Sequence, residues 1–459
     1  MKDAVLYKVK EFLRKYYLTE APLLLGFSGG PDSVALLYLL LECKRFFPDL
    51  DLHLAHVDHG WRSESAAQAS KLRDFAHLLN LPFHQGTLPK PEENESNLEA
   101  KARESRLRFF KDLYFQCGCQ ALLLGHHKND QAETVLKRIF EGASLVSLGG
   151  LRAVSELYGM HIWRPLLNVS KQEIHHWLEE KGLQSLDDPT NRDPKFLRSR
   201  MRTHIFPRIE SSFGKQIHGN LCYLADSSSE LKAYFDRRTE PMFRQIKKGP
   251  FGSYLDFNPF FPIERLEIRA FFKKFGEVQE LLLSHDNLEL LEQLILSKAA
   301  NKRLRFKNKW LFVDRGFFFF MEDPMLPFAV TGPLLSKEMI HNGWIWRCSY
   351  EPRSVYVETS SWKNLWLGAA RVVLPKGDYE LTPPDLTASF PRNTPIRKWW
   401  GNHYIPAFLR TIFPVISQKG EIVHEFLTGK SVLAGKLEPF VVFSLDITKI
   451  VSNLNKKFY

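Results

Sequence analysis

The chain has 459 residues, of which 44% are hydrophobic and 25% are charged. This composition is typical of folded globular domains and excludes a disordered, collagen-like or disulfide-scaffold chain, and the length predicts about three domains. The longest apolar run, Val34–Leu41, is far shorter than the roughly 18 to 20 residues of a membrane-spanning helix, and the N-terminus lacks the apolar stretch of a signal peptide. We therefore expect a cytoplasmic protein with no membrane partner.

The net charge of +11 is unevenly divided along the chain. The first 215 residues contain 30 Lys and Arg against 27 Asp and Glu, whereas the remaining residues contain 33 against 25. The more basic second half suggests a polyanionic partner such as nucleic acid, although solubility alone explains the charge equally well. The five cysteines are odd in number and form no C-x-x-C motif, and the single-residue spacing of Cys117 and Cys119 is unusual for a metal site, so we expect free thiols.

Over residues 1–165, short apolar runs alternate with stretches whose apolar residues have helical spacing. The predicted helices are Val5–Tyr17, Ser33–Cys43, Ser65–Leu79, Asn97–Phe115 and Asp130–Phe140, and the predicted strands are Leu23–Phe27, Leu52–Val57, a weaker one from Phe83, and Ala121–Gly125. Strands separated by helices of ten or more residues pair in parallel through right-handed crossovers. We expect an α/β fold with a doubly wound, mostly parallel sheet and a ligand at the carboxyl ends of the strands.

The rest of the chain changes character. A more helical stretch that includes Ser170–Glu180 leads to a domain boundary near residue 215, followed by predicted helices and then a hairpin that turns at Asn308. The helices are Leu221–Tyr234, Glu264–Phe275 and Asn287–Leu296, and the hairpin strands are Arg303–Lys307 and Trp310–Phe320. We predict three domains: an α/β domain at 1–215, a mainly helical domain at 216–325 and a small mixed α+β domain at 330–459.

The segment S-G-G-P-D-S joins the predicted strand Leu23–Phe27 to the following helix. Its two glycines permit a tight turn and a close approach of the backbone to a ligand, and the N–H groups at the helix start form an anion site. A helix capped after a glycine turn would use the same residues, but the strand–helix junction favours phosphate binding. The G-K-[ST] ending of a Walker A loop is absent.

This segment resembles the pyrophosphate loop of the N-type ATP pyrophosphatases, which cleave ATP to AMP and pyrophosphate while adenylylating a substrate. That superfamily includes GMP, NAD and asparagine synthetases, tRNA thiolases and tRNA(Ile)-lysidine synthetases. The resemblance implies that the loop binds ATP through Ser28, Gly29, Gly30, Pro31, Asp32 and Ser33.

Two further strings are similar to the lysidine synthetases among these. Residues 56–62, H-V-D-H-G-W-R, resemble their H-V-D-H-G-L-R segment, and residues 97–106 resemble N-x-E-x-x-A-R-x-x-R, with Leu107 where an aromatic residue is usual. Taken alone, the His-x-x-His is more typical of structural histidines than of zinc, and Glu99 with Arg103 is typical of a surface helix pair. The resemblance implies that His56 contacts ATP and that Arg106 stabilises phosphate charge.

The string G-H-H-K-N-D-Q-A-E-T, residues 125–134, ends the fourth predicted strand and begins a helix. Asp130 and Glu133 share one helical face there, and acids in a first helical turn are commonly only caps and dipole partners. The string resembles the lysidine synthetase segment H-H-x-D-D-Q-A-E-T, with Asn129 in place of one acid. The resemblance implies that His126 binds ATP and that Asp130 and Glu133 hold or deprotonate a lysine amine, with Asp32 and Asp130 as candidate Mg²⁺ ligands.

Two basic segments complete the resemblance. Residues 188–191 followed by R-S-R-M-R at 198–202 resemble D-x-[ST]-N … R-N-x-I-R, which implies that Arg198 stabilises developing phosphate charge and that Arg202 reaches ATP or tRNA phosphate. A solvated basic face would look the same. Near the C-terminus, residues 397–416 mix basic and aromatic side chains and resemble the end domain of full-length lysidine synthetases. This implies tRNA contacts for Arg397, Lys398 and Arg410, although the aromatics are equally typical of a core.

The resemblance as a whole implies a tRNA(Ile)-lysidine synthetase, a ligase that forms a carbon–nitrogen bond using ATP and Mg²⁺. It also implies that residues 1–215 form the catalytic domain and that the domains at 216–325 and 330–459 bind tRNA. Its partners would be free L-lysine and the isoleucine tRNA with a CAU anticodon, and it would act as a monomer or homodimer. One rival is a tRNA thiolase, which would need catalytic cysteines. A second is a non-catalytic RNA-binding protein with a relict nucleotide fold. A glutamine-dependent enzyme such as GMP synthetase finds no support, because no glutaminase Cys–His constellation is evident.

Overall fold

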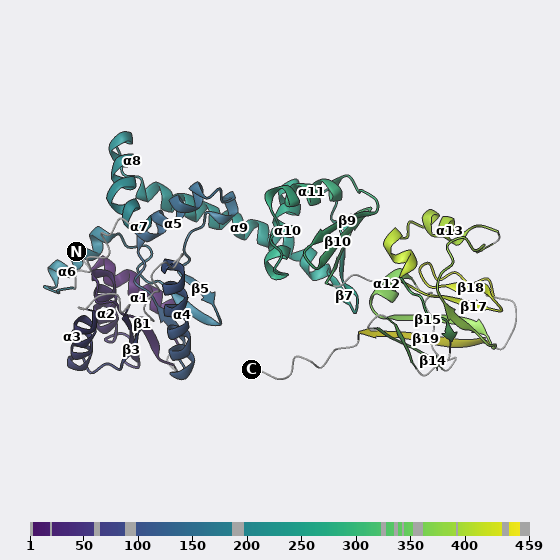
Figure 1. Ribbon diagram of the computed structural model, residues 1–459. Coiled ribbons are helices and arrows are strands. Elements are labelled where there is room, and N and C mark those ends of the chain that lie inside the picture. The colour runs from purple at the N-terminus through teal and green to yellow at the C-terminus, as the bar shows by residue number, and fades with distance from the viewer. Residues whose placement is uncertain are drawn as a thin grey trace. The chain divides into compact units, whose positions relative to one another are not determined.

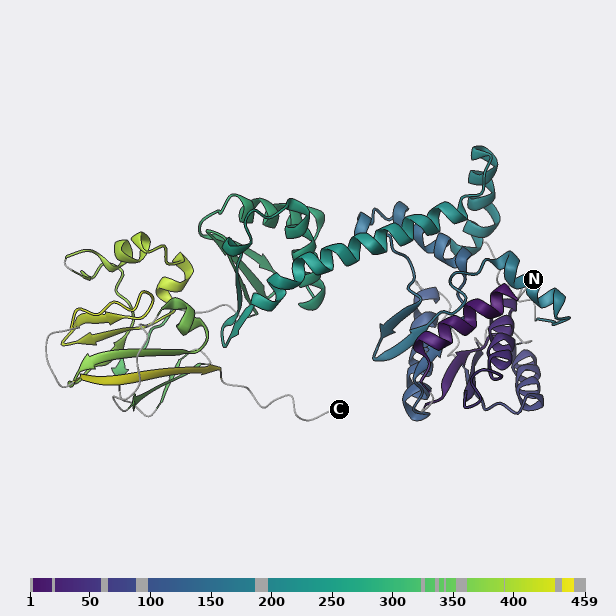
Figure 2. The same ribbon diagram turned by 180° about the vertical axis from the view of Figure 1, so that it is seen from behind.

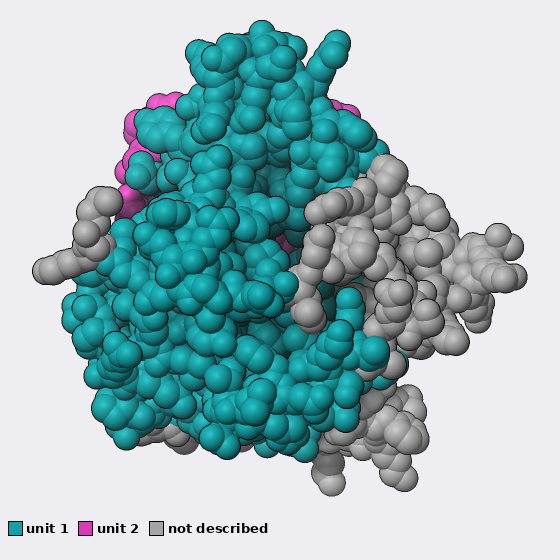
Figure 3. All heavy atoms as spheres, turned by 90° about the vertical axis from the view of Figure 1, so that its left-hand side faces the viewer, with its two compact units in different colours: residues 1–233 teal, residues 234–459 magenta. Residues whose placement is uncertain are grey.

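A computed structural model describes eleven segments of the chain, and contacts divide the chain into two compact units, residues 1–233 and 234–459 (Figure 3). The described segments are 3–18, 21–58, 65–87, 98–185, 197–322, 327–334, 338–341, 344–351, 361–391, 393–433 and 440–449. Among the helices of these segments, none combines the length and the apolar composition needed to cross a lipid bilayer.

Unit 1 is built on a six-stranded sheet in the order β3-β2-β1-β4-β6-β5. The strands are β1 Leu23–Gly26, β2 Leu52–Asp58, β3 Phe83–Thr87, β4 Ala121–Leu123, β5 Val154–Leu157 and β6 Met160–Trp163. All neighbours are parallel except β5 and β6, which confirms the predicted mostly parallel sheet. The β5–β6 hairpin was not predicted, because its strands are short; it turns at Tyr158 and Gly159, which both have positive φ.

Helices cover both faces of this sheet (Figures 1 and 2). The helices of unit 1 before residue 217 are α1 Ala4–Tyr16, α2 Pro31–Cys43, α3 Ser65–Leu78, α4 Leu98–Gln116, α5 Lys128–Phe140, α6 Lys171–Glu180, α7 Leu197–Arg200 and α8 Phe206–Phe213, with a π-helical turn at Met201–Ile205. One core joins the sheet to α1, α2, α3 and α6, and a second core joins its other face to α4. This is the doubly wound arrangement, in which both faces of a parallel sheet are buried.

The order of the strands determines where a ligand can bind. From β1 the chain proceeds to β2 and β3 on one side of it, and then returns to β4 on the other side. The strand order therefore reverses between β1 and β4, and the connections that follow these two strands diverge at their carboxyl ends. In open α/β sheets ligands bind in the crevice at such a point.

The long helix α9, His218–Gln245, passes from unit 1 into unit 2. Its first half packs beside α5: Cys222 belongs to a small core with Ala132 and Leu136, and Ser228 Oγ donates to the carbonyl oxygen of Leu145 at 2.6 Å. The domain boundary expected near residue 215 lies just before this helix. In the structure, the boundary between the two compact units falls within the helix, after residue 233.

The described residues of unit 2 form three antiparallel sheets. The first, in the order β7-β8-β11-β10-β9, packs against α10 Arg265–Val278 and α11 His285–Leu296; its strands are β7 Lys247–Gly249, β8 Gly252–Asp256, β9 Lys302–Phe306, β10 Lys309–Asp314 and β11 Phe317–Met321. The hairpin predicted at Arg303–Phe320 is therefore wrong in its second half. Arg315 and Gly316, with φ of 48° and 86°, divide Trp310–Phe320 into two strands. The region predicted as mainly helical thus also holds a five-stranded sheet.

The other two sheets of unit 2 have four strands each. One has the order β12-β16-β17-β18 and the other β13-β14-β19-β15, with strands β12 Gly332–Pro333, β13 Met339–His341, β14 Trp344–Glu351, β15 Ala369–Pro375, β16 Glu380–Thr382, β17 Val415–Gln418, β18 Glu421–Glu425 and β19 Phe440–Lys449. They share a core with two short helices, α12 Trp362–Trp366 and α13 Ile396–Asn402. This confirms the mixed α+β character expected for the C-terminal region.

A buried glutamate anchors α13, the helix that contains the first part of the predicted basic and aromatic segment at residues 397–416. Glu425 is fully buried and accepts hydrogen bonds from Trp400 Nε1 at 2.7 Å, Trp399 Nε1 at 3.4 Å and the Thr428 N–H at 3.0 Å. Burial raises the pKa of this carboxyl group. Within the described residues, Glu425 is the only acceptor for the Trp400 indole N–H, and it shares the Trp399 indole N–H with the Thr428 hydroxyl.

We expect the substitution Glu425→Ala to destabilise unit 2 by about 2 kcal/mol, because it leaves buried donors without an acceptor. Glu421→Ala, at an exposed position of the same strand β18, is the matched control and should change the unfolding free energy by less than about 0.5 kcal/mol. Urea unfolding followed by tryptophan fluorescence measures both. Equal stability of the two variants would contradict the anchoring role.

Candidate active site

The loop between β1 and α2 is closed by its own serines. Gly29 has a φ of 78°, a conformation that glycine adopts without steric cost, and Gly30 is the N-cap of α2. Ser33 Oγ donates to the carbonyl oxygen of Gly30 at 3.0 Å and lies 3.2 Å from Ser28 Oγ. The loop thus lies at the positive end of a 13-residue helix, as an anion site requires.

A glycine at the end of β4 lets that strand approach the loop closely. A Cβ atom on Gly125 would lie 3.2 Å from the carbonyl carbon and oxygen of Asp32 and 3.3 Å from the nitrogen of Ser33. Because Gly125 has no Cβ, the backbones touch at the point where the strand order reverses. His126 and His127 are the next two residues of the chain, so this contact places them beside the loop.

His127 lies between two carboxylates. It is buried, and its Nε2 is 3.6 Å from Asp32 Oδ2 and 3.6 Å from Asp130 Oδ2. The Nδ1 atom accepts a hydrogen bond from the Asn129 N–H, so in the neutral ring the proton resides on Nε2 and faces both carboxylates. The His127 N–H in turn donates to Asp130 Oδ2 at 2.9 Å, which completes a capping box at the start of α5.

Arg202 binds the two carboxylates of α5. Its Nε donates to Glu133 Oε1 at 2.5 Å, and its Nη2 donates to Glu133 Oε2 at 3.1 Å and to Asp130 Oδ1 at 2.8 Å. The π-helical turn at Met201–Ile205 contains Arg202, and the buried side chain of Met201 packs against α5. Such turns often occur at functional sites, where they redirect a side chain. Arg202, predicted to contact phosphate, is thus paired with the two predicted catalytic acids.

The three acids of this cluster differ in their pKa. Burial raises the pKa of Asp32 despite the opposing charge of His127, and burial likewise raises the pKa of Glu133 despite its hydrogen bonds from Arg202. Burial alone would also raise the pKa of Asp130, but His127, His126 and Arg202 together hold it below its usual value. Environments that separate the pKa values of neighbouring carboxyl groups are typical of acid–base sites.

One carboxylate oxygen of the cluster is available to a ligand. Asp32 Oδ1 is buried and has no hydrogen-bond partner among the described residues, whereas both oxygens of Asp130 and of Glu133 accept hydrogen bonds. A buried, unsatisfied carboxylate oxygen beside an anion loop fits a Mg²⁺ ligand. Of the two predicted Mg²⁺ ligands, Asp32 therefore fits better than Asp130.

A group of arginines lies on the other side of His126. Arg164 Nε donates to His126 Nδ1 at 3.2 Å, and its Nη1 donates to the carbonyl oxygen of Arg152 and to Ser155 Oγ. Burial lowers the pKa of Arg164 to about 10 and also lowers the pKa of Arg106, to which the charge of Arg198 contributes. Among the described residues neither Arg164 nor Arg106 forms a salt bridge with a carboxylate. Arg164 is buried and Arg106 is half-buried, and cations that are partly shielded from water and lack acidic partners are suited to binding phosphate.

Arg164 was missed by the sequence analysis. It directly follows β6, the partner of β4 in the sheet, and therefore reaches the same carboxyl edge as His126. In the sequence, Arg164 is simply a charged residue after the short run M-H-I-W, and this pattern is too weak to indicate a site. The tertiary pairing of β6 with β4 is what brings it there.

His56 lies beside the loop, as expected. Its Nδ1 is 3.0 Å from the carbonyl oxygen of Phe27, the residue before Ser28, and its ring stacks on Phe83. Burial lowers its pKa, so the ring is neutral and donates from Nδ1. Residues 59–62 and 188–191 and the side chain of Glu99, which belong to the predicted motifs, lie outside the described residues.

The three tRNA contacts predicted near the C-terminus lie in unit 2. Arg397 and Lys398 are exposed on α13, whereas Trp400 on the same helix is buried in the core. Arg410 is half-buried, and its Nε and Nη2 donate to the carbonyl oxygen of Ile405 at 3.0 and 2.6 Å. Arg410 therefore braces its own loop, while the other two cations point outward.

We expect Arg202→Met to lower the unfolding free energy of unit 1 by about 3 kcal/mol at neutral pH, because it leaves the buried Glu133 and Asp130 without their guanidinium partner. The double variant R202M/E133Q should recover part of this loss. Arg208→Met, at an exposed position of α8, is the matched control. Thermal and urea unfolding measure the effect, and an R202M variant as stable as R208M would contradict it.

The half-buried His126 makes the stability of unit 1 depend on pH. Its pKa falls from 6.5 to about 3, mainly through burial, so the unfolded chain takes up a proton below pH 6.5 that the folded chain does not. The unfolding free energy should therefore decrease as the pH falls from 6.5 towards 3, by at most about 1.4 kcal/mol per pH unit from this group. His126→Gln should remove this contribution, whereas His161→Gln, at an exposed position of β6, should keep the slope of the parent chain. Identical slopes in all three proteins would refute the prediction.

Comparison with known proteins adds an independent observation. Residues 1–209 match a family described as a PP-loop domain. A tRNA(Ile)-lysidine synthase from Protochlamydia amoebophila is 38% identical over 430 residues, which cover 93% of each chain, and one from Chlamydia pneumoniae is 34% identical over 64% of this chain and 90% of its own. Among solved structures, the U34-tRNA thiolase NcsA from Methanococcus maripaludis is 20% identical, with a TM-score of 0.42 over 50% of this chain and 77% of its own, too distant to inform function. Because the identity to lysidine synthases extends over nearly the whole chain, the chain belongs to the tRNA(Ile)-lysidine synthase family.

Proposed function

We propose that the candidate active site joins free lysine to an isoleucine tRNA with a CAU anticodon in two steps. ATP first adenylylates O2 of the wobble cytidine and releases pyrophosphate. The ε-amine of lysine then attacks C2, AMP leaves, and lysidine remains, so that the anticodon reads AUA instead of AUG. The observation that supports this most strongly is the 38% identity to a lysidine synthase across both chains, with the loop and the acidic cluster at one sheet edge.

The loop and the arginines account for the first step. The backbone N–H groups of the loop at residues 28–33, other than that of Pro31, would hold the pyrophosphate of ATP at the start of α2, and His56 would lie beside the nucleotide. Arg106, Arg164 and Arg198 would stabilise the charge that develops on the phosphates. Mg²⁺, when bound, neutralises phosphate charge, and Asp32 Oδ1 is the oxygen best suited to hold it.

The acidic cluster accounts for the second step. A lysine amine with a pKa near 10.4 is mostly protonated at neutral pH and must lose a proton before it attacks. Asp130 and Glu133 would bind the ammonium group and take that proton, and Arg202 would be their partner when lysine is absent. The raised pKa of Glu133 favours it as the proton acceptor.

The surface of unit 2 would contribute to tRNA binding. Arg397 and Lys398 are exposed cations on a helix that Glu425 anchors, which suits them to phosphate contacts. Arg410 would contribute to tRNA binding indirectly, by holding the loop whose Ile405 carbonyl oxygen accepts its hydrogen bonds.

The rival reaction, sulfur transfer, needs a reactive thiolate. All five cysteines are free, but Cys117 and Cys119 precede β4 and so lie at the opposite end of the strands from the loop. Cys222 lies near the start of α5, where it donates to the Lys128 carbonyl, but burial raises its pKa and makes it a poor nucleophile. The distance of Cys117 and Cys119 from the loop and the raised pKa of Cys222 therefore favour lysine ligation over sulfur transfer as the reaction of this site.

The decisive measurement is incorporation of labelled lysine into bulk tRNA with ATP and Mg²⁺ present or omitted. We expect ATP-dependent labelling of one isoleucine tRNA. ATP conversion to AMP and pyrophosphate without labelling would indicate another nucleophile, and no ATP turnover would favour a non-catalytic RNA-binding protein.

The variant Asp130→Asn tests the role of the acidic cluster. We expect it to reduce lysine incorporation by about 100-fold or more, because Asp130 would hold the ammonium group from which Glu133 takes the proton, and such general-base steps contribute roughly 10² to 10⁴. Asp74→Asn, at an exposed position of α3, should retain full activity. An Asp130→Asn variant that adenylylates and transfers lysine at the parent rate would exclude Asp130 from the chemistry.

A further inference from the structure

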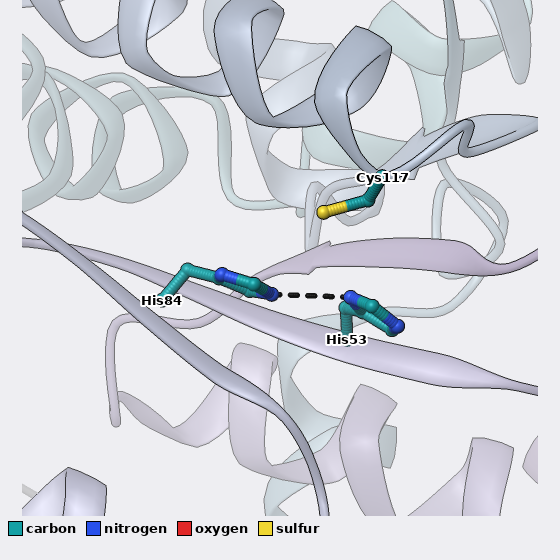
Figure 4. Close-up of side chains that lie close together, drawn as sticks. All are labelled: His53, His84 and Cys117. Carbon is teal, nitrogen blue, oxygen red and sulfur yellow. Dashed lines mark hydrogen bonds between the residues drawn. The ribbon is translucent and has the colours of Figure 1, made fainter.

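Three side chains that can bind a transition metal meet at the amino ends of the strands of unit 1, away from the candidate active site. His53 is the second residue of β2, His84 is the second residue of β3, and Cys117 directly follows α4. One donor atom from each lies within 4.8 Å of the other two. Figure 4 shows the two imidazole rings with their nitrogens facing each other and the Cys117 thiol above them.

The fold explains why these residues meet. His84 pairs with Ala55 in the register of β2 and β3, so His53 occupies the diagonal position two residues before it. Because side chains alternate along a strand, His53 lies on the same face of β2 as Ala55 and Val57, which pack beneath α4. The end of α4 places Cys117 over this face, and Gly118 turns the chain away with a φ of 63°.

The donor atoms already have nearly the spacing of a tetrahedral site. His53 Nδ1 and His84 Nε2 are 3.1 Å apart. Zinc–nitrogen bonds of about 2.0 to 2.1 Å at a tetrahedral angle place two nitrogens about 3.3 to 3.4 Å apart, so the rings need to separate by only a few tenths of an ångström. The Cys117 sulfur lies within 4.8 Å of a donor nitrogen of each ring, at a half-buried position directly after a helix.

A carboxylate lies behind one of the rings. Asp51 Oδ2 is 3.8 Å from His53 Nε2, on the side of the ring opposite the nitrogen that faces His84. Metal-bound histidines commonly direct their second nitrogen to a carboxylate, which orients the ring and strengthens the ligand. His53 Nδ1 and His84 Nε2 share a hydrogen bond, which the ion would replace. Each neutral ring would then keep its proton on its other nitrogen, which for His53 is Nε2 beside Asp51.

We propose that His53, His84 and Cys117 bind one Zn²⁺ ion. Two imidazoles and a thiolate suit zinc and disfavour magnesium or calcium, which prefer oxygen ligands. Binding would exchange the thiol proton of Cys117 for a zinc–sulfur bond, release that proton to solvent, and leave the fourth position to water. The ion would tie β2 and β3 to the end of α4, the helix that also contains Arg106, so its role would be to stabilise unit 1.

The test uses the full-length chain after treatment with a chelator. Zn²⁺ is titrated in competition with a chromophoric chelator, and Co²⁺ serves as a spectroscopic probe. We expect one equivalent of Zn²⁺, a rise in the melting temperature with Zn²⁺ concentration, and a thiolate-to-Co²⁺ charge-transfer band. Less than one equivalent at micromolar free Zn²⁺, or a Co²⁺ complex of the parent chain without that band, would overturn the proposal without reference to any variant.

Variants then identify the ligands. Cys117→Ser should abolish the charge-transfer band and weaken Zn²⁺ binding by more than about 100-fold, and Asp51→Asn should weaken it by about 10-fold or more. His175→Gln, at an exposed position of α6, should leave both unchanged. Persistence of the band in a folded Cys117→Ser variant, or unchanged Zn²⁺ affinity in His84→Gln, would overturn the assignment. Far-UV circular dichroism of each variant without metal establishes that it is folded.

Discussion

The ion pair between Arg202 and the two acids of α5 is the interaction on which the active site depends. Asp130 and Glu133 are nearly inaccessible to solvent, and a buried carboxylate without a partner would take up a proton or destabilise the fold. Arg202 donates to both, across about 70 residues of sequence, and so keeps two acids beside the loop that contains Asp32. The same pair attaches the segment after residue 197 to α5, and it therefore links the integrity of the fold to the chemistry of the site.

Two glycines set the geometry around that pair. Gly29 permits the turn that brings Ser28 and Ser33 together, and Gly125 permits contact between the end of β4 and the start of α2. Because β1 and β4 are neighbours, both contacts occur at the point where the strand order reverses. Close backbone contacts at this edge of the sheet therefore place the anion loop beside the acids and arginines of the site.

The structure also separates two kinds of basic residue that the sequence cannot distinguish. Arg397 and Lys398 are exposed on α13, whereas Arg410 uses its guanidinium to bind a backbone carbonyl. The interleaved aromatics divide in the same way, since Trp400 is buried and donates to Glu425. A basic and aromatic stretch is thus partly core and partly surface, and only the surface part is suited to nucleic acid.

The sequence by itself determined the parallel sheet, the anion loop and the family resemblance, because these depend on local patterns: apolar runs, helical spacing and glycines at a strand–helix junction. It also placed Asp32, His126, Asp130 and Glu133 at one edge, since parallel strands end together. Only the tertiary structure decided that Arg202 binds the two acids, that Arg164 reaches His126, and that Trp310–Phe320 is divided by a turn. The contacts of Arg202 and Arg164 join segments about 40 to 70 residues apart, and His53, His84 and Cys117 meet through strand register and helix packing. No local pattern records such contacts, because they arise when separate elements bury their apolar faces together.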